Sequence, residues 1–320
     1  MWTPPKKEKQ EPVTLRRFAG HTRFSQYFNE LKVAHLTDQH VGRVTPMSVQ
    51  KHAVQLVNEQ KPDLVVITGD FVCHGQAYLD ALEEVISEID APVIGVLGNH
   101  DHWSGAKEVR HSLKKAGAEV LDNANTIVTL GHVRLQVLGL DDAYTGHADL
   151  RKASRGLRSD LPVLGLSHIA EEAEKMWQLG VPLVLSGHTH AGQITLARLH
   201  EFALGHLAGH RFVHGLYGSR FDNREKTSGA VYVGAGIGAS VMPLRIGDRG
   251  RPEVTIFELG LEPGSLDEHH EEQNPLPGRK PSAKALAKRA AKVKRKQRSR
   301  DRQAAKVSQP LKNSKKSKKI

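Results

Sequence analysis

The feature of this sequence that most constrains its fold is a series of short apolar runs, each followed by polar residues and then by a segment with helical spacing. The runs have four or five residues, are rich in valine, isoleucine and leucine, and cover 33–37, 64–68, 93–97, 163–167 and 183–186. Runs of this length and composition favour buried strands over helices. Strands that alternate with helices predict an α/β fold.

Helix signals lie between several of the runs. Thr45-Pro46 is typical of the start of a helix that Pro62 ends, residues 76–89 place apolar side chains on one face, and Ser104 can cap a helix that ends near 117. Gly131-His132 separates two β-rich segments, which predicts a hairpin. Later strands are expected at 231–233 and 254–259.

Charge divides the chain into a body and a tail. The 320 residues include 46 Lys and Arg against 35 Asp and Glu, a net charge of +11, and residues 279–320 alone hold 18 bases and one acid. The rest is acidic on balance, so the body has no excess of basic charge for binding polyanions. We expect four parts: an N-terminal segment 1–30, one domain 31–261, an acidic, Pro- and Gly-containing linker 262–281, and a basic, disordered tail 282–320.

Membrane-spanning and secreted classes do not fit the sequence. Membrane spans need about 20 apolar residues, and no run approaches that length. The first ten residues are charged and lack the apolar stretch of a secretory signal. A single cysteine, Cys73, permits no internal disulfide and no thiolate zinc finger. The expected location is the cytoplasm, with peripheral association at the inner face of the membrane as a further expectation.

Polar side chains follow five of the predicted strands. In an α/β sheet, groups at the carboxyl ends of the strands converge in one crevice. Any one of these residues alone has an ordinary structural explanation, because a single histidine is more often a hydrogen-bonded packing group than a ligand. Their occurrence at five successive strand ends is what predicts a common site. The residues are Asp38, His40, Asp70, Asn99, His100, Asp101, His168, His188 and His190.

Oxygen and imidazole donors without sulfur suit Mn, Fe, Zn or Co. Seven candidate ligands are too many for one tetrahedral ion and match two ions that share a bridging carboxylate. Such a pair acidifies a bridging water to hydroxide and clamps the attacking and leaving oxygens of a displacement at phosphorus. The donor set therefore predicts a phosphoester hydrolase with two divalent metal ions.

The ordered motifs resemble those of the calcineurin-like metallophosphoesterase superfamily, namely Asp-x-His, Gly-Asp, Gly-Asn-His-Asp/Glu, His and Gly-His-x-His, from about 33 to 259. The resemblance implies a four-layer sandwich of two mixed β-sheets flanked by helices. It implies that His100 contacts the phosphoryl oxygen or protonates the leaving group and that Asp101 orients His100. It also implies two metal sites, one with Asp38, His40, Asp70 and His190, and one with the bridging Asp70, Asn99, His168 and His188.

A finer resemblance is to a bacterial phosphodiesterase subgroup with a Gly-His-Thr-His-Gly-Gly-Gln motif. Here the segment is Gly187-His-Thr-His-Ala-Gly-Gln193, so Ala191 replaces a glycine. Some members hydrolyse the pyrophosphate of UDP-2,3-diacylglucosamine in lipid A biosynthesis, and the expectation is a similar phosphodiesterase or pyrophosphatase, with manganese among the candidate metals. The alternatives are a nucleotide or cyclic-nucleotide phosphodiesterase, and a nucleic-acid-binding protein that acts through its tail.

Three features outside the motifs stay open at this stage. The basic tail can bind an anionic membrane surface or nucleic acid without sequence specificity, and a solvated tail without a partner is the plain alternative. Cys73 and His74 follow Asp70 closely and are expected to pack beside the site more often than to bind metal. The His-rich segment 200–214 is either a substrate-facing insertion or an ordinary loop.

Overall fold

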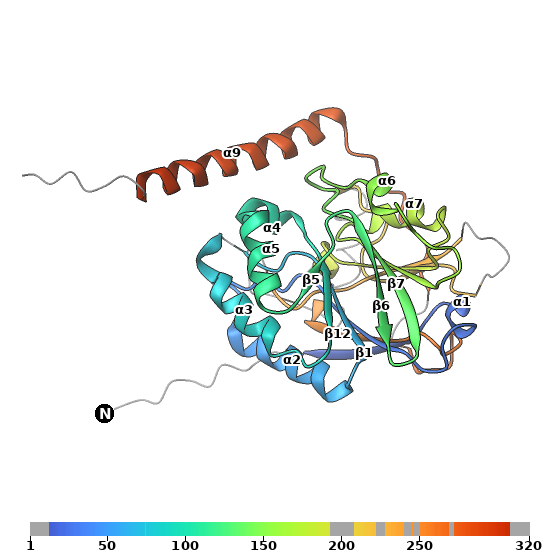
Figure 1. Ribbon diagram of the computed structural model, residues 1–320. Coiled ribbons are helices and arrows are strands. Elements are labelled where there is room, and N and C mark those ends of the chain that lie inside the picture. Colours follow the sequence, from blue (N-terminus) through green and yellow to red (C-terminus); the bar gives the residue numbers. More distant parts are fainter. Residues whose placement is uncertain are drawn as a thin grey trace, which may run out of the picture.

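The computed structural model describes residues 13–73, 75–192, 208–221, 228–239, 245, 250–268 and 272–307. Two six-stranded mixed sheets pack face to face, and helices cover their outer faces (Figure 1). The predicted four-layer α/β sandwich is confirmed. None of the helices in these ranges is both long and apolar enough to cross a bilayer.

The first sheet has the strand order β1-β12-β2-β3-β4-β5. Its strands β2, β3, β4 and β5 are parallel, β12 runs antiparallel to β2, and β1 runs parallel to β12. The bounds are β1 Thr14–Ala19, β12 Glu253–Glu258, β2 Lys32–Leu36, β3 Leu64–Thr68, β4 Val93–Val96 and β5 Glu119–Val120.

The second sheet has the order β10-β11-β9-β8-β7-β6. Strands β11, β9, β8 and β7 are parallel, and the two edge strands β10 and β6 are antiparallel to their neighbours. The bounds are β10 Gly215–Gly218, β11 Ala230–Val233, β9 Leu183–Ser186, β8 Val163–Leu166, β7 Val133–Gly139 and β6 Ala124–Leu130.

Both faces of the central strands are buried, which explains why their sequences are continuous apolar runs. In β3, Leu64 and Val66 point into the core between the two sheets, whereas Val65 and Ile67 face the helices on the outer side. This alternation is the period-two geometry of a strand. A strand covered on both sides needs apolar residues at every position, as the sequence indicates.

Helices cover both outer faces. Helices α2 (Met47–Gln60), α3 (Leu79–Ser87) and α5 (Ala106–Lys115) pack on the first sheet, and α6 (Leu150–Ala153) and α7 (Ala173–Trp177) pack on the second. The remaining short elements are α1 (Thr22–Ser25), α4 (Asn99–Ser104) and the 3₁₀ turns Gln76–Tyr78, Ala170–Glu172 and His190–Gly192.

The five predicted strands and the hairpin are confirmed, and the bounds of the five strands agree with the prediction to within one residue. Two local predictions are wrong. Ser104 ends α4 instead of capping a long helix, because Gly105 separates α4 from α5. Residues 14–25 are also not a separate segment, because β1 pairs with β12 and Phe18 and Phe24 lie in the core between the sheets.

The C-terminal part also differs from the prediction. The segment expected to be a linker contacts the body, since Arg220 forms ion pairs with Glu268 and Glu272. Residues 283–307 form one long helix, α9, where the composition predicts disorder. Figure 1 shows α9 lying along the edge of the molecule beside α4, with which it is in contact. The helix is rich in Ala, Lys, Arg and Gln, which favour helix formation. Cation–aromatic contacts, and not apolar burial, hold it on the body.

Candidate metal centre

The predicted ligands come together at one edge of the two sheets. They lie in the turns that follow β2, β3, β4, β8 and β9 and at the start of α4. Three groups of side chains in the described ranges have ligand atoms within 4.8 Å of one another; one comprises His40, Cys73 and His100, and Asp70 belongs to both of the others. Of these two, the first group comprises Asp38, His40, Asp70 and His190, and the second comprises Asp70, His168 and His188.

In the first group, the ring nitrogens and carboxylates face a common centre. Nε2 of His40 lies 3.0 Å from Nε2 of His190 and 3.5 Å from Oδ2 of Asp70. Oδ1 of Asp38 lies 3.3 Å from Nε2 of His190. All four residues are buried. Two imidazole nitrogens that face each other beside two carboxylates form a set of donors for a cation.

The second group is built from the opposite sheet. Nε2 of His168 lies 3.4 Å from Oδ2 of Asp70 and 3.2 Å from Nδ1 of His188. Nδ1 of His168 donates to the backbone oxygen of Thr68 at 2.7 Å, and Nε2 is the ring nitrogen that faces the site. Asn99 lies nearby at the start of α4, where the next backbone N–H, that of His100, donates to Asp70 at 2.7 Å.

The backbone at these positions is unusual. Five of the seven predicted ligands have positive φ angles, at Asp38 (49°), His40 (44°), Asp70 (54°), His188 (77°) and His190 (52°). Residues with a Cβ rarely adopt this region, and clusters of such residues occur at functional sites. Ala191, which replaces a glycine of the related motif, also has φ of 50° and is fully buried.

Glycine at position 187 allows the two sheets to meet at the site. A Cβ atom placed on Gly187 would overlap the side chains of Thr37 and Asp38, which follow a strand of the other sheet. The backbone N–H of His188 thereby donates to Oδ2 of Asp38 at 2.9 Å. The close approach requires glycine here and explains the Gly-His pair in the sequence.

The buried charges around the site set the protonation states of the ligand side chains. Burial alone would lower the pKa of His168, but the carboxylates of Asp70, Asp38 and Asp142 outweigh it and raise that pKa to about 10. Burial would raise the pKa of Asp70, whereas His168 and His100 hold it well below its usual range. Burial lowers the pKa of His40 and His188 well below 6.5, so their rings are neutral. Neutral imidazoles and ionised carboxylates are the protonation states that bind metal.

Unpartnered buried atoms support the same conclusion. Oδ1 of Asp38 and Oδ1 of Asn99 are buried and accept no hydrogen bond within the described part of the chain. A buried acceptor without a partner is costly unless a ligand satisfies it. Carboxylate, amide and imidazole donors together suit a divalent metal of the first transition row. The residues therefore fit a divalent metal centre.

Comparison with known proteins agrees with this geometry. The family model described as calcineurin-like phosphoesterase matches residues 31–192. The chain is 32% identical over 234 residues to phosphodiesterase YaeI of Escherichia coli, covering 71% of this chain and 82% of that protein. It is 29% identical to the metallophosphoesterase YkuE of Bacillus subtilis, covering 72% and 80%. The chain belongs to the calcineurin-like phosphoesterase family.

Among solved structures, the chain is similar to the NAD nucleotidase of Haemophilus influenzae, with 17% identity, a TM-score of 0.48, and coverage of 66% of this chain and 51% of that one. Members of the calcineurin-like phosphoesterase family use divalent metals, and this chain brings a matching ligand cluster together. The protein is a metal-dependent phosphoester hydrolase.

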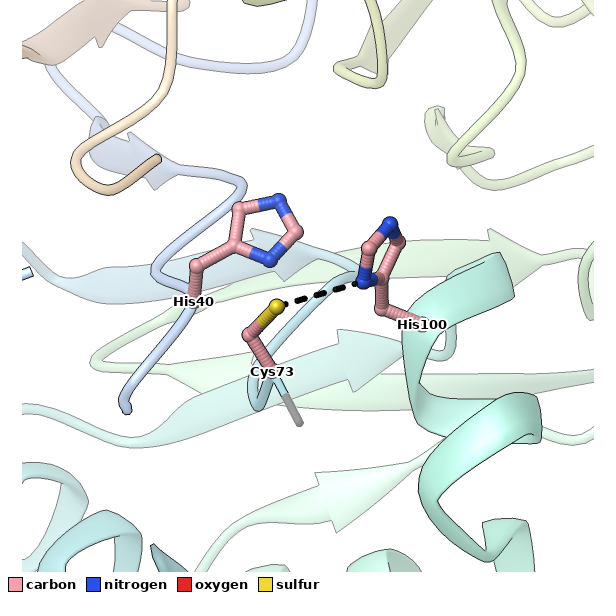
Figure 2. Close-up of side chains that lie close together, drawn as sticks. All are labelled: His40, Cys73 and His100. Atoms are coloured by element: carbon pink, nitrogen blue, oxygen red, sulfur yellow. Dashed lines mark hydrogen bonds between the residues drawn. The ribbon is translucent and has the colours of Figure 1, made fainter. Parts of the chain in front are cut away.

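Two residues of this phosphoesterase site have neighbours other than those predicted. Asp101 does not orient His100: its two carboxylate oxygens accept from the backbone N–H groups of Gly98 (2.9 Å) and Val72 (3.1 Å). Burial and the charge of Asp70 raise the pKa of Asp101 to about 7. The neighbour of His100 is Cys73, whose Sγ lies 3.4 Å from Nδ1 of His100. Figure 2 shows Sγ between the rings of His40 and His100.

The remaining polar candidates have structural partners. Asp141 contacts His102 and Arg110, and Asp142 accepts a hydrogen bond from its own loop, so both stabilise that loop. His210 contacts Glu171, and His214 contacts the buried Glu253, so these two histidines do not share a site. His74 and residues 193–207 lie outside the described residues.

No pattern in the sequence pointed to the aromatic residues around the site. The ring of Trp103 lies 4.7 Å from the ring of His100, and that of Tyr144 lies 5.1 Å from His188. Arg289 and Lys292 of α9 lie over these two aromatic rings. If residues 283–307 are taken as a helix, Arg289 and Lys292 fall on the same face of it. Their aromatic partners could not be predicted, because Trp103 and Tyr144 are distant in the sequence.

Proposed function

We propose that the protein hydrolyses a phosphodiester or a diphosphate with two divalent cations, one at each group of ligands. The observation that supports this most directly is the position of Asp70, whose carboxylate belongs to both groups and would bridge the two ions. Centres with two metals 3.5–4 Å apart are typical of enzymes that displace groups at phosphorus.

Each ligand has a defined part in this proposal. Asp38, His40 and His190 would hold one cation, and His168, His188 and Asn99 the other. When bound, the two cations would neutralise charge on the phosphoryl group and supply an acidified water as the nucleophile. No side chain of the protein is required as a nucleophile, so no phospho-enzyme is expected. Manganese, iron, zinc and cobalt are the candidate metals.

His100 would act on the substrate directly. The ring is half-buried, and its Nδ1 faces Cys73, which leaves Nε2 for a phosphoryl oxygen or for the leaving group. Burial and neighbouring histidines lower the pKa of His100, although Asp70 opposes them. The ring is therefore neutral and presents one N–H as a hydrogen-bond donor. Donors aimed at developing charge accelerate phosphoryl transfer.

Metal analysis combined with a substrate panel tests the proposal. Purified protein should contain up to two equivalents of divalent metal. It should hydrolyse bis-p-nitrophenyl phosphate in an assay with added manganese. The panel should include UDP-2,3-diacylglucosamine, because the motif after β9 is similar to that of enzymes of lipid A synthesis, and cyclic nucleotides as the alternative class. A protein that takes up metal but cleaves no diester or diphosphate contradicts the proposed reaction.

The place of action is part of the same proposal. A single cysteine agrees with a reducing compartment, and we propose the cytoplasm, with the enzyme at the inner face of the membrane. Fractionation of cells that express the full chain tests this. Release of the protein from the membrane fraction by salt is expected for a charge-dependent association.

A further inference from the structure

Helix α9 turns a basic face toward the body of the protein. Of its described side chains, those partly buried recur every three or four residues and include Arg289, Lys292, Lys296 and Arg300. The guanidinium of Arg289 lies 3.8 Å from the ring centre of Tyr144, and Nζ of Lys292 lies 3.4 Å from that of Trp103. Nη1 of Arg300 donates to the backbone oxygen of Trp103 at 2.6 Å. These contacts fix the orientation of α9 on α4.

This face of α9 lies against the accessible side of the metal centre. Asp38, His40, Asp70, Asn99, His168 and His190 are buried, whereas His100 and His188 remain partly exposed. A substrate must therefore approach past His100 and His188. The two aromatic residues under α9 are the ring neighbours of these same histidines, Trp103 beside His100 and Tyr144 beside His188. Helix α9 thus extends from the His100 side to the His188 side of the route by which a substrate reaches the metal centre.

The two lysine ammonium groups on this face are not paired with a carboxylate in the part of the chain that the structure describes. Lys292 and Lys296 make cation–aromatic contacts with Trp103, and no ion pair joins either lysine to a carboxylate in the described ranges. The one acid of α9, Asp301, accepts a hydrogen bond from Gln297. Burial against the body and the neighbouring cations lower the pKa of both lysines. An anion beside them would relieve this repulsion.

We propose that Lys292 and Lys296 bind a second anionic group of the substrate, so that the enzyme prefers phosphodiesters or diphosphates that carry a further phosphate on one of the two groups joined by the cleaved linkage. The inference rests on the proposed function and adds a specificity-determining role for α9. The two ammonium groups and His100 contact the same aromatic ring, that of Trp103. The ammonium groups can therefore contact a second phosphate of a substrate whose reacting phosphorus lies at the metal centre. Charge-assisted hydrogen bonds of this kind discriminate between ligands that differ by one phosphate.

Two substrates that differ only in that group provide the test. Thymidine 5′-(p-nitrophenyl phosphate) and its 3′-phosphorylated derivative release the same chromophore and differ by one phosphate. We expect the full-length, metal-loaded enzyme to have a KM about tenfold lower for the 3′-phosphorylated substrate, with similar kcat. The paired double variants are Lys292→Gln with Lys296→Gln on the docked face, and Lys288→Gln with Lys294→Gln on the exposed face of the same helix.

The two double variants remove equal charge and keep helix-favouring residues, so they separate local contact from the overall field of the helix. The docked-face variant should lose the preference for the 3′-phosphorylated substrate, and the exposed-face variant should keep it. Binding of thymidine 3′,5′-bisphosphate and thymidine 5′-monophosphate to the metal-loaded proteins, measured by calorimetry, should show the same difference. Circular dichroism at 222 nm checks that α9 remains helical in both variants.

Three results would overturn the proposal. The first is a wild-type enzyme with equal KM for the two substrates. The second is an equal loss of preference in both double variants, which indicates a long-range effect of charge. The third is a docked-face variant with higher kcat/KM for both substrates, which indicates that α9 obstructs the site. In each case cleavage of the unphosphorylated substrate still supports the proposed function, whereas no cleavage of either substrate contradicts that function itself.

Discussion

Sγ of Cys73 lies 3.4 Å from Nδ1 of His100, and the rings of His100 and His40 meet edge to face with centres 4.7 Å apart. The one cysteine of the chain thus lies beside a predicted metal ligand and beside the histidine expected to contact substrate. Asp101 does not take this place, since its carboxylate is held by backbone groups. Cys73 therefore positions His100.

Replacement of Cys73 by alanine should lower kcat by about tenfold with little change in KM, because the His100 ring loses the neighbour that fixes its orientation while the binding groups remain. Metal content should stay at the wild-type level. Steady-state kinetics and metal analysis of Cys73→Ala and Cys73→Ser measure both quantities. A variant that turns over at the wild-type rate would show that Cys73 only fills space.

Replacement of His100 by alanine should lower kcat by 10²-fold or more, the usual contribution of a group that donates or accepts a proton in the transition state. The metal content should not change, because His100 is not among the proposed ligands. Asp101→Asn is a useful comparison, since it alters a neighbouring residue whose contacts are structural. Full activity of His100→Ala would contradict the role assigned to this ring.

The buried Glu253 predicts a specific sensitivity to acid. Its carboxylate contacts Arg16 at 2.6 Å and His214 at 3.0 Å, and these partners hold its pKa well below 4.5 although burial opposes them. A lowered carboxylate pKa stabilises the fold above about pH 4.5, and that stabilisation is lost as the pH falls further toward the pKa in the folded protein.

Glu253→Gln should therefore destabilise the protein at pH 7, by about 3–5 kcal/mol as for the loss of one partner from a buried ion pair. The difference in unfolding free energy between wild type and variant should shrink below pH 4.5, since the carboxyl takes up a proton in the unfolded chain there while it stays ionised in the folded protein. Urea denaturation at several pH values measures it. A difference that is constant between pH 7 and pH 3 would contradict this assignment.

The exposed face of α9 predicts a salt-dependent affinity for polyanions. Lys288, Lys294, Arg295 and Arg298 point away from the body. Their replacement by glutamine should weaken binding to anionic vesicles or to DNA and reduce the dependence of that binding on salt, because fewer phosphates are neutralised. Turnover of bis-p-nitrophenyl phosphate should be unchanged. Polyanion binding that survives the fourfold replacement would place the contact elsewhere in the chain.

Local patterns predicted most of the sheet because the central strands are buried on both faces. Strand β3 is apolar throughout and is followed by Gly69-Asp70, so its end could be found from the sequence. Strand β1 was missed because it contains two arginines and pairs with β12, more than 230 residues away. A strand that depends on such a distant partner has little local signature.

The ligand set could be predicted because each ligand follows a strand. The side chains that surround the ligands could not be predicted in this way. Asp101 is next to His100 in sequence but bonds to Gly98 and Val72, and Cys73 takes the neighbouring position. Helix α9 was predicted to be disordered because it has almost no large apolar residues. Trp103 and Tyr144 hold α9 through cation–aromatic contacts, which cannot be predicted from the composition of the helix.

The metal content of Asp70→Asn tests the central claim most directly. Asp70 belongs to both ligand groups, so its replacement should reduce bound divalent metal from two equivalents to one or none and abolish hydrolysis of bis-p-nitrophenyl phosphate. Inductively coupled plasma mass spectrometry on wild type and variant, loaded and desalted side by side, provides the measurement. An Asp70→Asn protein that keeps two equivalents of metal, or a wild-type protein that binds none, would contradict a shared centre at this carboxylate.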